Sequence, residues 1–281
     1  MRAGLVVHPG SGSGAAARVA DTVAARLRPV VDELHVGTGP ASGLDLLVVL
    51  GGDGAVHHAV RYCAAHGVPL GLLPAGNGND LARALDLPLD PLGALEVLLT
   101  ALREGRRRRL DLGSAGDAWF ATVLCAGFDA AVARRAHALR WPRGPRRYDV
   151  AVLAELARFR SHPVAVRTEH ERFELDATLV AVGNTAYYGG GIPICPSARP
   201  DDGLFDVTLV GRASRANLVR LLPKLRAGAH LRHPAVRTLR AREVRIEGIG
   251  GTALPLVVDG EPLPAGPVTV RCVPGALTVV A

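Results

Sequence analysis

The sequence has little of the chemistry that marks several large enzyme classes. Its 281 residues include one lysine, Lys224, and no G-x-x-x-x-G-K-[ST] motif. A P-loop NTPase is therefore excluded as far as its motif defines it, and so is a protein kinase, which needs a strand lysine near its glycine loop. The sequence also lacks the G-x-S-x-G motif and the cysteine and histidine spacing of zinc sites.

Aromatic residues and long apolar runs are also scarce. Aromatics make up 4% of the chain, which argues against a surface that stacks nucleic-acid bases, so we expect no nucleic-acid partner. No stretch approaches the roughly 18 apolar residues of a membrane span, and the first residues lack the apolar run of a signal peptide. The four cysteines are scattered without C-x-x-C spacing, which is typical of buried residues in a reducing compartment. We therefore expect a cytoplasmic protein, peripheral at the inner face of the membrane.

The charge and the length of the chain set two further expectations. The 33 Lys and Arg residues against 26 Asp and Glu residues give a net charge of +7, which favours an anionic partner such as a nucleotide or a membrane surface. A chain of 281 residues is long enough for two medium-sized domains, and two is the number we expect.

The most informative stretch covers residues 44–60. The unbroken apolar run 46–50 predicts a strand buried on both faces of a parallel sheet, and it ends at Gly51, Gly52, Asp53 and Gly54. Glycines allow a sharp turn and a close approach of backbone N–H groups to a ligand, with Asp53 at the carboxyl edge of the sheet. The loop suits a polyphosphate, and a tight turn with a capping Asp is the simpler alternative.

Two further glycine-rich loops also follow short predicted strands. One follows residues 4–7 and precedes a helix over 15–27; it also fits the dinucleotide fingerprint G-x-G-x-x-A, but without the acidic residue that should end the second strand. The other follows residues 70–73 and ends at Asn79 and Asp80, which could instead cap the next helix. Because such loops meet at one sheet edge, we predict a shared phosphate site.

The pattern changes near residue 112, which divides the chain into the expected domains 1–112 and 113–281. Strand and helix patterns alternate in the first, which predicts an α/β domain with a parallel sheet. Strand-like segments separated by turns dominate the second, including one predicted over 119–124, and predict an antiparallel β-sandwich or barrel.

Six motifs together resemble the diacylglycerol kinase catalytic-domain family, which includes sphingosine kinases and bacterial lipid kinases. They are GGDG at 51–54, PAGNGND at 74–80, DLG at 111–113, GFDA at 127–130, PSARPDDG at 196–203 and DGE at 259–261. The resemblance spans nearly the whole chain. NAD kinases and 6-phosphofructokinases have loops similar to GGDG, whereas the last two motifs make the match specific.

The resemblance implies a Rossmann-like nucleotide domain, a C-terminal β-sandwich and an active site in the cleft between them. It also implies that ATP and Mg²⁺ are cofactors and that the γ-phosphate passes to a lipid hydroxyl, with diacylglycerol as the favoured acceptor. It places the ATP phosphates among Pro9, Ser11, Gly12, Gly51, Gly52, Asp53, Gly54, Gly76, Asn77, Gly78 and Asn79.

The same resemblance assigns the acidic residues. Those of the implied cleft are Asp53, Asp80, Asp111 and Glu261, with Asp53 or Glu261 as the base. A Mg²⁺ site is implied at the D-D-G turn, formed by the Asp202 carboxylate and the carbonyls of Arg199 and Leu204.

Four positions depart from the family pattern. His8 stands in place of an asparagine, Ala55 of a threonine, His58 of a glutamate and Asn77 of a threonine or serine. Lost hydroxyls would weaken contacts to ATP or metal. A catalytically impaired nucleotide- or lipid-binding paralogue is therefore one alternative, and an NAD kinase-like phosphotransferase is another.

A basic stretch around Trp141 is the candidate for membrane contact, with an exposed helix end as the alternative. Its arginines are Arg134, Arg135, Arg140, Arg143, Arg146 and Arg147. The sequence does not indicate which lipid is the acceptor. It carries no signal for or against a homodimer.

Overall fold

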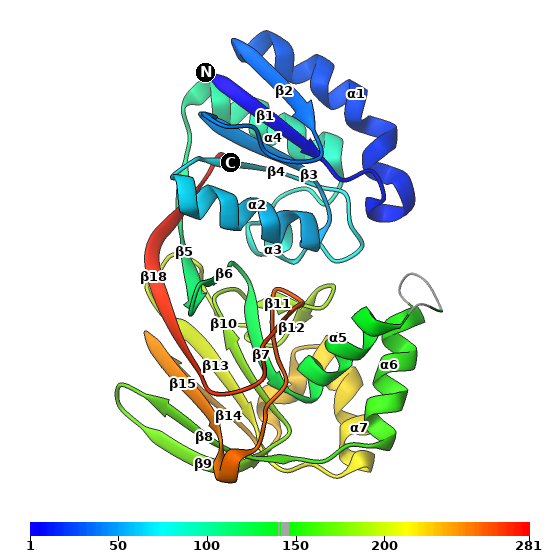
Figure 1. Ribbon diagram of the computed structural model, residues 1–281, viewed down its shortest axis with the longest axis vertical. Coiled ribbons are helices and arrows are strands. Elements are labelled where there is room, and N and C mark those ends of the chain that lie inside the picture. The colour runs from blue at the N-terminus through cyan, green and yellow to red at the C-terminus, as the bar shows by residue number, and fades with distance from the viewer. Residues whose placement is uncertain (140, 142–145) are drawn as a thin grey trace.

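The computed structural model describes residues 1–139, 141 and 146–281, which form an N-terminal α/β part above a C-terminal β-rich part (Figure 1). In the N-terminal part, four parallel strands pair in the order β2-β1-β3-β4. Their bounds are β1 (Arg2–Val7), β2 (Glu33–Gly37), β3 (Leu46–Gly51) and β4 (Leu70–Pro74).

Helices cover both faces of this parallel sheet. Helices α1 (Ala15–Leu27) and α4 (Pro91–Glu104) pack on one face, and α2 (Asp53–His66) packs on the other. All six residues of β3 are buried between these layers, which explains its unbroken apolar run. The short helix α3 (Asp80–Ala84) follows β4, and 3₁₀ turns lie at η1 (Ser11–Gly14) and η2 (Arg28–Val30).

The C-terminal part is a sandwich of two sheets. The first is antiparallel, in the order β14 (Val236–Ala241), β13 (Phe205–Val210), β10 (Leu179–Gly183), β7 (Val123–Gly127), β16 (Leu256–Val258), β17 (Glu261–Leu263). The second continues from β4 of the N-terminal part as one ten-stranded sheet. Its strands in the C-terminal part are β18 (Val268–Val279), β15 (Glu243–Gly248), β8 (His162–Thr168), β9 (Arg172–Ala177), β5 (Arg108–Ala115) and β6 (Ala118–Phe120). Phe120 and Phe205 stack between the sheets with ring centroids 5.8 Å apart.

Helices α5 (Phe128–Ala138) and α7 (Arg215–Arg226) pack on the outer face of the first sheet. Helix α6 (Arg146–Ala157) packs against α5, on the side away from the sheet. Ala130 and Ala133 of α5 contact Cys125 of β7 and Leu179 of β10 in one apolar cluster. The remaining elements are the hairpin β11 (Tyr187–Tyr188) and β12 (Ile192–Pro193) and the turns η3 (Ala229–Arg232) and η4 (Ile249–Gly251).

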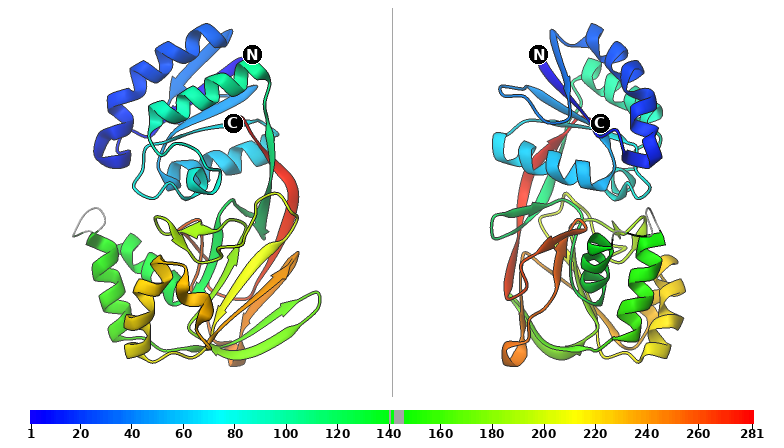
Figure 2. Two further views of the ribbon diagram at one scale, coloured as in Figure 1. Left: turned by 180° about the vertical axis from the view of Figure 1, so that it is seen from behind. Right: turned by 45° about the vertical axis from the view of Figure 1, so that its right-hand side comes forward.

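Two long strands, β5 and β18, connect the two parts. They pair antiparallel with a register shift between Val273 and Leu277. Val279 at the end of β18 pairs in parallel with Leu70 of β4, so the chain ends in the N-terminal sheet. Both chain ends therefore lie in the N-terminal part (Figure 2). The domain boundary predicted at residue 112 falls inside β5 and stays a prediction.

The predicted fold class is confirmed, but three predicted strands were wrong in detail. The strand expected over 119–124 is interrupted, because the N–H groups of Ala121 and Thr122 donate to the Asp259 carboxylate instead of a neighbouring strand. The apolar pattern of the sequence also predicts separate strands over 268–272 and 277–280, but the structure has one continuous strand there, β18. Within the described residues, the helices are too short or too polar to cross a membrane.

Candidate active site at the junction of the two parts

The three glycine-rich loops lie against one another at the carboxyl edge of the parallel sheet. Val7 pairs with Leu50 and Gly51 pairs with Pro74, so β1, β3 and β4 end at the same level. The N–H of Gly52 donates to Ser11 Oγ over 3.1 Å, and the N–H of Ala75 donates to the Gly51 carbonyl over 2.7 Å.

The second and third loops approach too closely to carry side chains at Gly52 and Gly76. A Cβ atom on Gly76 would lie 2.6 Å from Gly52 Cα, well inside normal contact. Gly12 is restricted in the same way, because its Cβ would overlap the Ala75 carbonyl and its φ is +56°. The glycines therefore leave a surface of backbone rather than side chains at this edge. Pro9 and Asn77 lie exposed beside it.

Asp53, the first residue of α2, ties the second loop to the third. Its carboxylate accepts the N–H of Asn79 at 2.9 Å and the N–H of Asp80 at 2.7 Å. Asn79 has a φ of +57°, and its side chain exchanges two 2.9 Å hydrogen bonds with the backbone of Gly76. Both oxygens of Asp53 thus hold the third loop in place.

Asp80 connects the third loop to the C-terminal part. Its carboxylate accepts the N–H groups of Gly190 at 3.1 Å and Gly191 at 2.6 Å, in the turn between β11 and β12. The residue is 6% exposed. Burial, and after it the nearby charge of Asp53, raise the pKa of Asp80 to about 6. Two carboxylates that repel in this way form a site where a cation would be stabilised.

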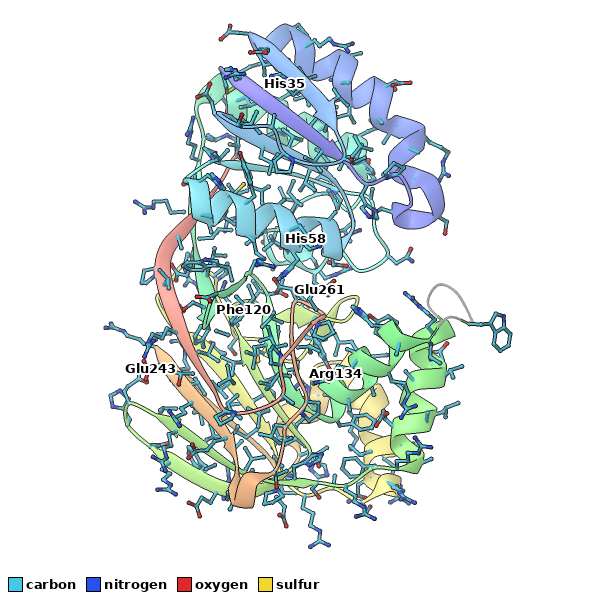
Figure 3. All side chains as sticks on the ribbon, in the orientation of Figure 1. His35, His58, Phe120, Arg134, Glu243 and Glu261 are labelled. Atoms are coloured by element: carbon cyan, nitrogen blue, oxygen red, sulfur yellow. The ribbon has the colours of Figure 1, made fainter. Side chains whose placement is uncertain are left out.

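Glu261 approaches the second loop from the C-terminal part. It begins β17, and its Oε1 lies 3.7 Å from where a Cβ on Gly54 would be. Figure 3 places it just below α2, the helix that carries His58. Its carboxylate accepts no hydrogen bond from the described residues. Glu261 and Asp53 therefore lie on facing surfaces of the two parts.

Tyr148 of α6 is close enough to this region to be affected by its charges, and no motif in the sequence pointed to it. Burial raises the pKa of the Tyr148 hydroxyl; the positive charge of Arg147 opposes this, and the charges of Glu261 and Asp53 add to it.

Asp111 lies in a different environment from the other predicted acids. It is 4% exposed, and its carboxylate accepts the N–H of Gly203 at 2.6 Å and the N–H of Gly275 at 2.7 Å. These bonds join the D-D-G turn to β18. The geometry gives Asp111 a role in holding the sandwich together, and its catalytic role stays a prediction.

The D-D-G turn does not fit a divalent cation as the residues stand. One oxygen of Asp202 accepts the N–H of Leu204 at 3.1 Å, and the other forms an ion pair with Arg240 of β14. The Arg199 guanidinium pairs with Asp201, and the role predicted for the carbonyls of Arg199 and Leu204 stays a prediction. Because the Arg240 guanidinium already supplies positive charge to Asp202, a metal would have to displace it.

The pair formed by Asp53 and Asp80 fits Mg²⁺ better, because its oxygens accept backbone N–H groups and, among the described residues, form no ion pair. Magnesium is usually held in nucleotide sites by one or two carboxylates together with substrate phosphates and waters. In the part of the chain that the structure describes, no cluster of three or more His, Cys, Asp or Glu side chains is arranged as a metal site. A metal here would therefore depend on ligands that arrive with a nucleotide.

His57 and Asp259 are buried at the junction, and the sequence did not predict a role in the site for either residue. His57 Nδ1 lies 3.1 Å from Asp259 Oδ2, and the two side chains are 4% and 7% exposed. Two signals could have identified them. His57 is one helical turn after Asp53 and so shares its face of α2, and Asp259 opens the DGE motif.

The remaining predicted residues lie around this site or apart from it. His8 Nδ1 is 3.2 Å from Ser11 Oγ, and Ala55 packs against Gly51. In the basic stretch, Trp141 is 81% exposed and Arg135 of α5 pairs with Glu155 of α6. Arg140 and Arg143 lie outside the described residues.

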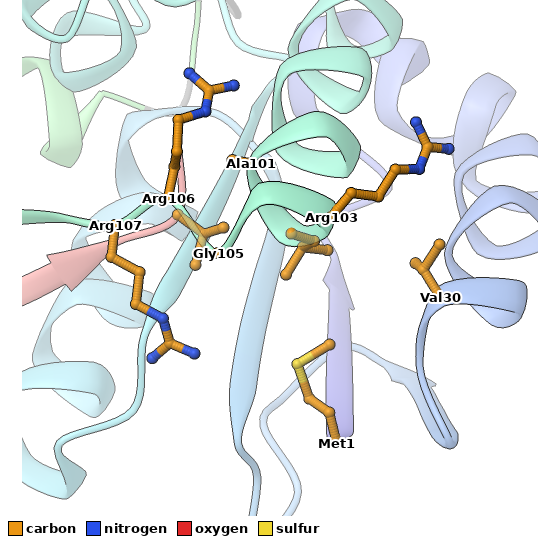
Figure 4. Close-up of a pocket in the computed structure, with 9 residues that line it drawn as sticks. Met1, Val30, Ala101, Arg103, Gly105, Arg106 and Arg107 are labelled. Carbon is orange, nitrogen blue, oxygen red and sulfur yellow. The ribbon is translucent and has the colours of Figure 1, made fainter.

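A separate pocket lies at the opposite edge of the N-terminal sheet, beside the start of β1 (Figure 4). It is lined by residues that include Met1, Val30, Arg103, Arg106 and Arg107. Because the glycine loops leave the carboxyl ends of the strands, this pocket is not part of the candidate site.

Two family models cover nearly the whole chain and define its class. The diacylglycerol kinase catalytic domain matches residues 2–115, and the YegS C-terminal NAD kinase beta sandwich-like domain matches residues 122–281. These are the α/β part and the sandwich described above. The class is that of a two-part kinase with its glycine loops facing a β-sandwich.

The chain belongs to the diacylglycerol kinase family, and it is a kinase enzyme. A diacylglycerol kinase of Mycobacterium tuberculosis (strain CDC 1551 / Oshkosh) is 39% identical over 297 residues, covering 98% of this chain and 93% of that protein. A diacylglycerol kinase of Staphylococcus carnosus (strain TM300) is 30% identical over 220 residues, covering 77% and 70%.

A solved structure shares the fold. A crystal structure of a diacylglycerol kinase from Bacillus anthracis str. Sterne matches with a TM-score of 0.76 over 99% of this chain and 96% of that chain. The two sequences are 22% identical, so this match supports the fold alone. The family and the enzyme class expected from the sequence are confirmed.

Proposed function

We propose that the protein is an ATP-dependent lipid kinase that transfers the γ-phosphate of ATP to the free hydroxyl of diacylglycerol, giving phosphatidic acid and ADP. The observation that carries the proposal is the facing arrangement of Glu261 and Gly54, with Glu261 Oε1 3.7 Å from the Cβ position of that glycine. An acid from the sandwich thus faces loops whose closest contacts are made by glycine backbone. The family and the names of the relatives support the lipid acceptor.

The loops supply the proposed phosphate site. The first and second loops lead into the N-termini of α1 and α2, where unpaired N–H groups and the helix dipole favour negative charge. The absence of side chains on Gly52 and Gly76 lets phosphates approach the backbone directly. In the first loop, Ser11 Oγ accepts a hydrogen bond from the N–H of Gly52 in the second loop.

Asp53 and Asp80 would hold the Mg²⁺ that accompanies ATP. When bound, the metal would neutralise charge on the terminal phosphates and relieve the repulsion that raises the pKa of Asp80. We propose no role for a metal at Asp202, Arg199 and Leu204, because Arg240 already pairs with that carboxylate.

Glu261 is the proposed base, in preference to Asp53. Its carboxylate makes no hydrogen bond to the described residues, whereas both oxygens of Asp53 hold backbone N–H groups. The lipid oxygen attacks the γ-phosphorus, the bond from phosphorus to the ADP oxygen breaks, and the lipid hydroxyl proton passes to Glu261 and then to water. Phosphoryl transfer depends mainly on position and charge, so the proton leaves late.

Access to a lipid requires contact with a membrane surface, and the end of α5 is the proposed contact. Trp141 is 81% exposed there, a few residues after Arg134. Amphipathic aromatics favour the membrane interface, and each nearby arginine would add about 1 kcal/mol at an anionic surface. Trp141→Ala should reduce sedimentation with vesicles that contain anionic lipid, and an unchanged bound fraction would contradict this contact.

An acceptor panel with labelled ATP tests the proposal. Diacylglycerol, sphingosine and NAD are each offered in mixed micelles with Mg²⁺, and the products are separated by thin-layer chromatography. We expect labelled phosphatidic acid. NAD is the second candidate acceptor, because the C-terminal domain model is described as NAD kinase-like. Labelled NADP would favour that function, and no labelled product would favour an impaired paralogue.

A further inference from the structure

The carboxylate of Asp259 links α2 to the segment between β6 and β7, which runs from one sheet of the sandwich to the other. It accepts four hydrogen bonds: from the N–H of Ala121 at 3.0 Å, the N–H of Thr122 at 2.8 Å, Thr122 Oγ1 at 2.6 Å and His57 Nδ1 at 3.1 Å. A buried carboxylate with this many donors is held in one orientation.

The position of Asp259 in the chain links this carboxylate to Glu261. Asp259 has a φ of +48° and Gly260 a φ of +86°, so the turn between β16 and β17 is tight, and Glu261 is the residue that follows it. A non-glycine residue at positive φ is retained where the surrounding contacts require it. The four bonds to Asp259 therefore fix the backbone from which Glu261 extends.

His57 connects this turn to α2 of the N-terminal part. It lies four residues after Asp53 on α2, so both side chains project from one face of the helix. Because a carboxylate is an acceptor, the proton of the contact resides on His57 Nδ1. The His57–Asp259 bond thus begins one turn from Asp53 and ends two residues from Glu261.

We propose that His57 and Asp259 form a positioning pair that holds Glu261 opposite Asp53 and the second loop. The role assigned to Glu261 rests on the proposed function; the His57–Asp259 contact does not. Neither member of the pair reaches the reacting atoms in this scheme, and both act through the placement of Glu261. A displacement of about 1 Å in a catalytic group can lower the rate about 100-fold.

Three substitutions of His57 separate positioning from simple packing. The amide nitrogen of asparagine stands as many bonds from the backbone as Nδ1 does, so His57→Asn keeps the donor. His57→Gln moves the donor one bond outward, and His57→Ala removes it. We expect His57→Gln and His57→Ala to lower kcat about 10- to 100-fold with KM for ATP unchanged, and His57→Asn to stay near wild type. His66→Ala, at the exposed end of the same helix, is the matched control.

The outcomes are distinct. Wild-type kcat in His57→Gln and His57→Ala would overturn the proposal, and so would an asparagine variant as slow as the glutamine variant. If His57→Gln and His57→Ala do not fold, Thr122→Val removes the 2.6 Å bond to Asp259 from the other side. We expect Thr122→Val to lower kcat at unchanged KM for ATP; wild-type kcat would contradict the proposal.

A readout without substrate separates this proposal from the lipid kinase function. Hydrogen exchange of the backbone N–H groups of Ala121 and Thr122, and of residues 259–261, should be faster in His57→Gln than in wild type and in His57→Asn. This result would support the pair even if no lipid were phosphorylated. Equal exchange in all three proteins would overturn it whatever the substrate proves to be.

Discussion

Replacing Gly76 with alanine should separate the second and third loops and remove most of the kinase activity. The new Cβ would lie 2.6 Å from Gly52 Cα and 2.9 Å from Asn79 Oδ1, whereas ordinary contacts are 3.4–4 Å. The first neighbour is backbone, which cannot rotate away as the end of a long side chain can. The two loops must therefore move apart by about 1 Å, the difference between this distance and a normal carbon contact.

The size of the effect follows from this displacement. Overpacking of this kind costs about 1–3 kcal/mol of folding free energy, so the protein should still fold. A shift of about 1 Å in the groups that hold the phosphates should lower kcat/KM about 100-fold. The effect should include weaker ATP binding, because the loops are the proposed phosphate site.

The assay compares Gly76→Ala with Gly39→Ala. A Cβ on Gly39 meets no atom within 4 Å, so the control adds the same methyl group in open space. Initial rates of lipid phosphorylation, ATP affinity by calorimetry and Tm are measured for both. A Gly76→Ala protein with wild-type kcat/KM and ATP affinity would refute the reasoning that these two loops form the phosphate site.

Three further predictions concern stability. Burial favours the neutral form of His230 and lowers the pKa of its imidazole below 6.5, so the contribution of His230 to the free energy of unfolding is complete above about pH 6.5 and is lost as the pH falls. Urea titrations should therefore show less acid destabilisation in His230→Gln than in wild type, and equal pH dependence of the two proteins would contradict this. Asp111→Asn should cost about 1–3 kcal/mol, because one backbone N–H loses its acceptor; an unchanged urea midpoint would exclude that anchoring role. Removing divalent cations with EDTA should leave Tm unchanged, because Arg240 balances Asp202, and a clear fall would reveal a structural metal.

The parts of the fold that depend on local pattern could be predicted from the sequence. The apolar run of β3 and the glycines after it specify a buried strand and a tight loop through neighbouring residues alone. Because β1, β3 and β4 are parallel and end at one level, the meeting of their loops follows from the same pattern.

The contacts that anchor the acids could not be predicted in this way. The interruption between β6 and β7 is caused by Asp259, which is 137 residues from Thr122 in the chain. Asp80 and Asp111 likewise bind N–H groups of Gly190 and Gly275, which no spacing in the sequence relates to them. The motifs identified the acidic residues, but their backbone partners come from distant turns that only the tertiary fold brings together.

Glu261→Gln tests the central claim most directly, with Glu104→Gln as its matched control. Glu104 pairs with Arg106 at the surface, away from the glycine loops. The transfer of label from ATP to diacylglycerol is measured under saturating ATP, with Tm to confirm folding. We predict that wild type and Glu104→Gln form labelled phosphatidic acid and that Glu261→Gln forms almost none while still binding ATP. Wild-type turnover in Glu261→Gln would contradict the account.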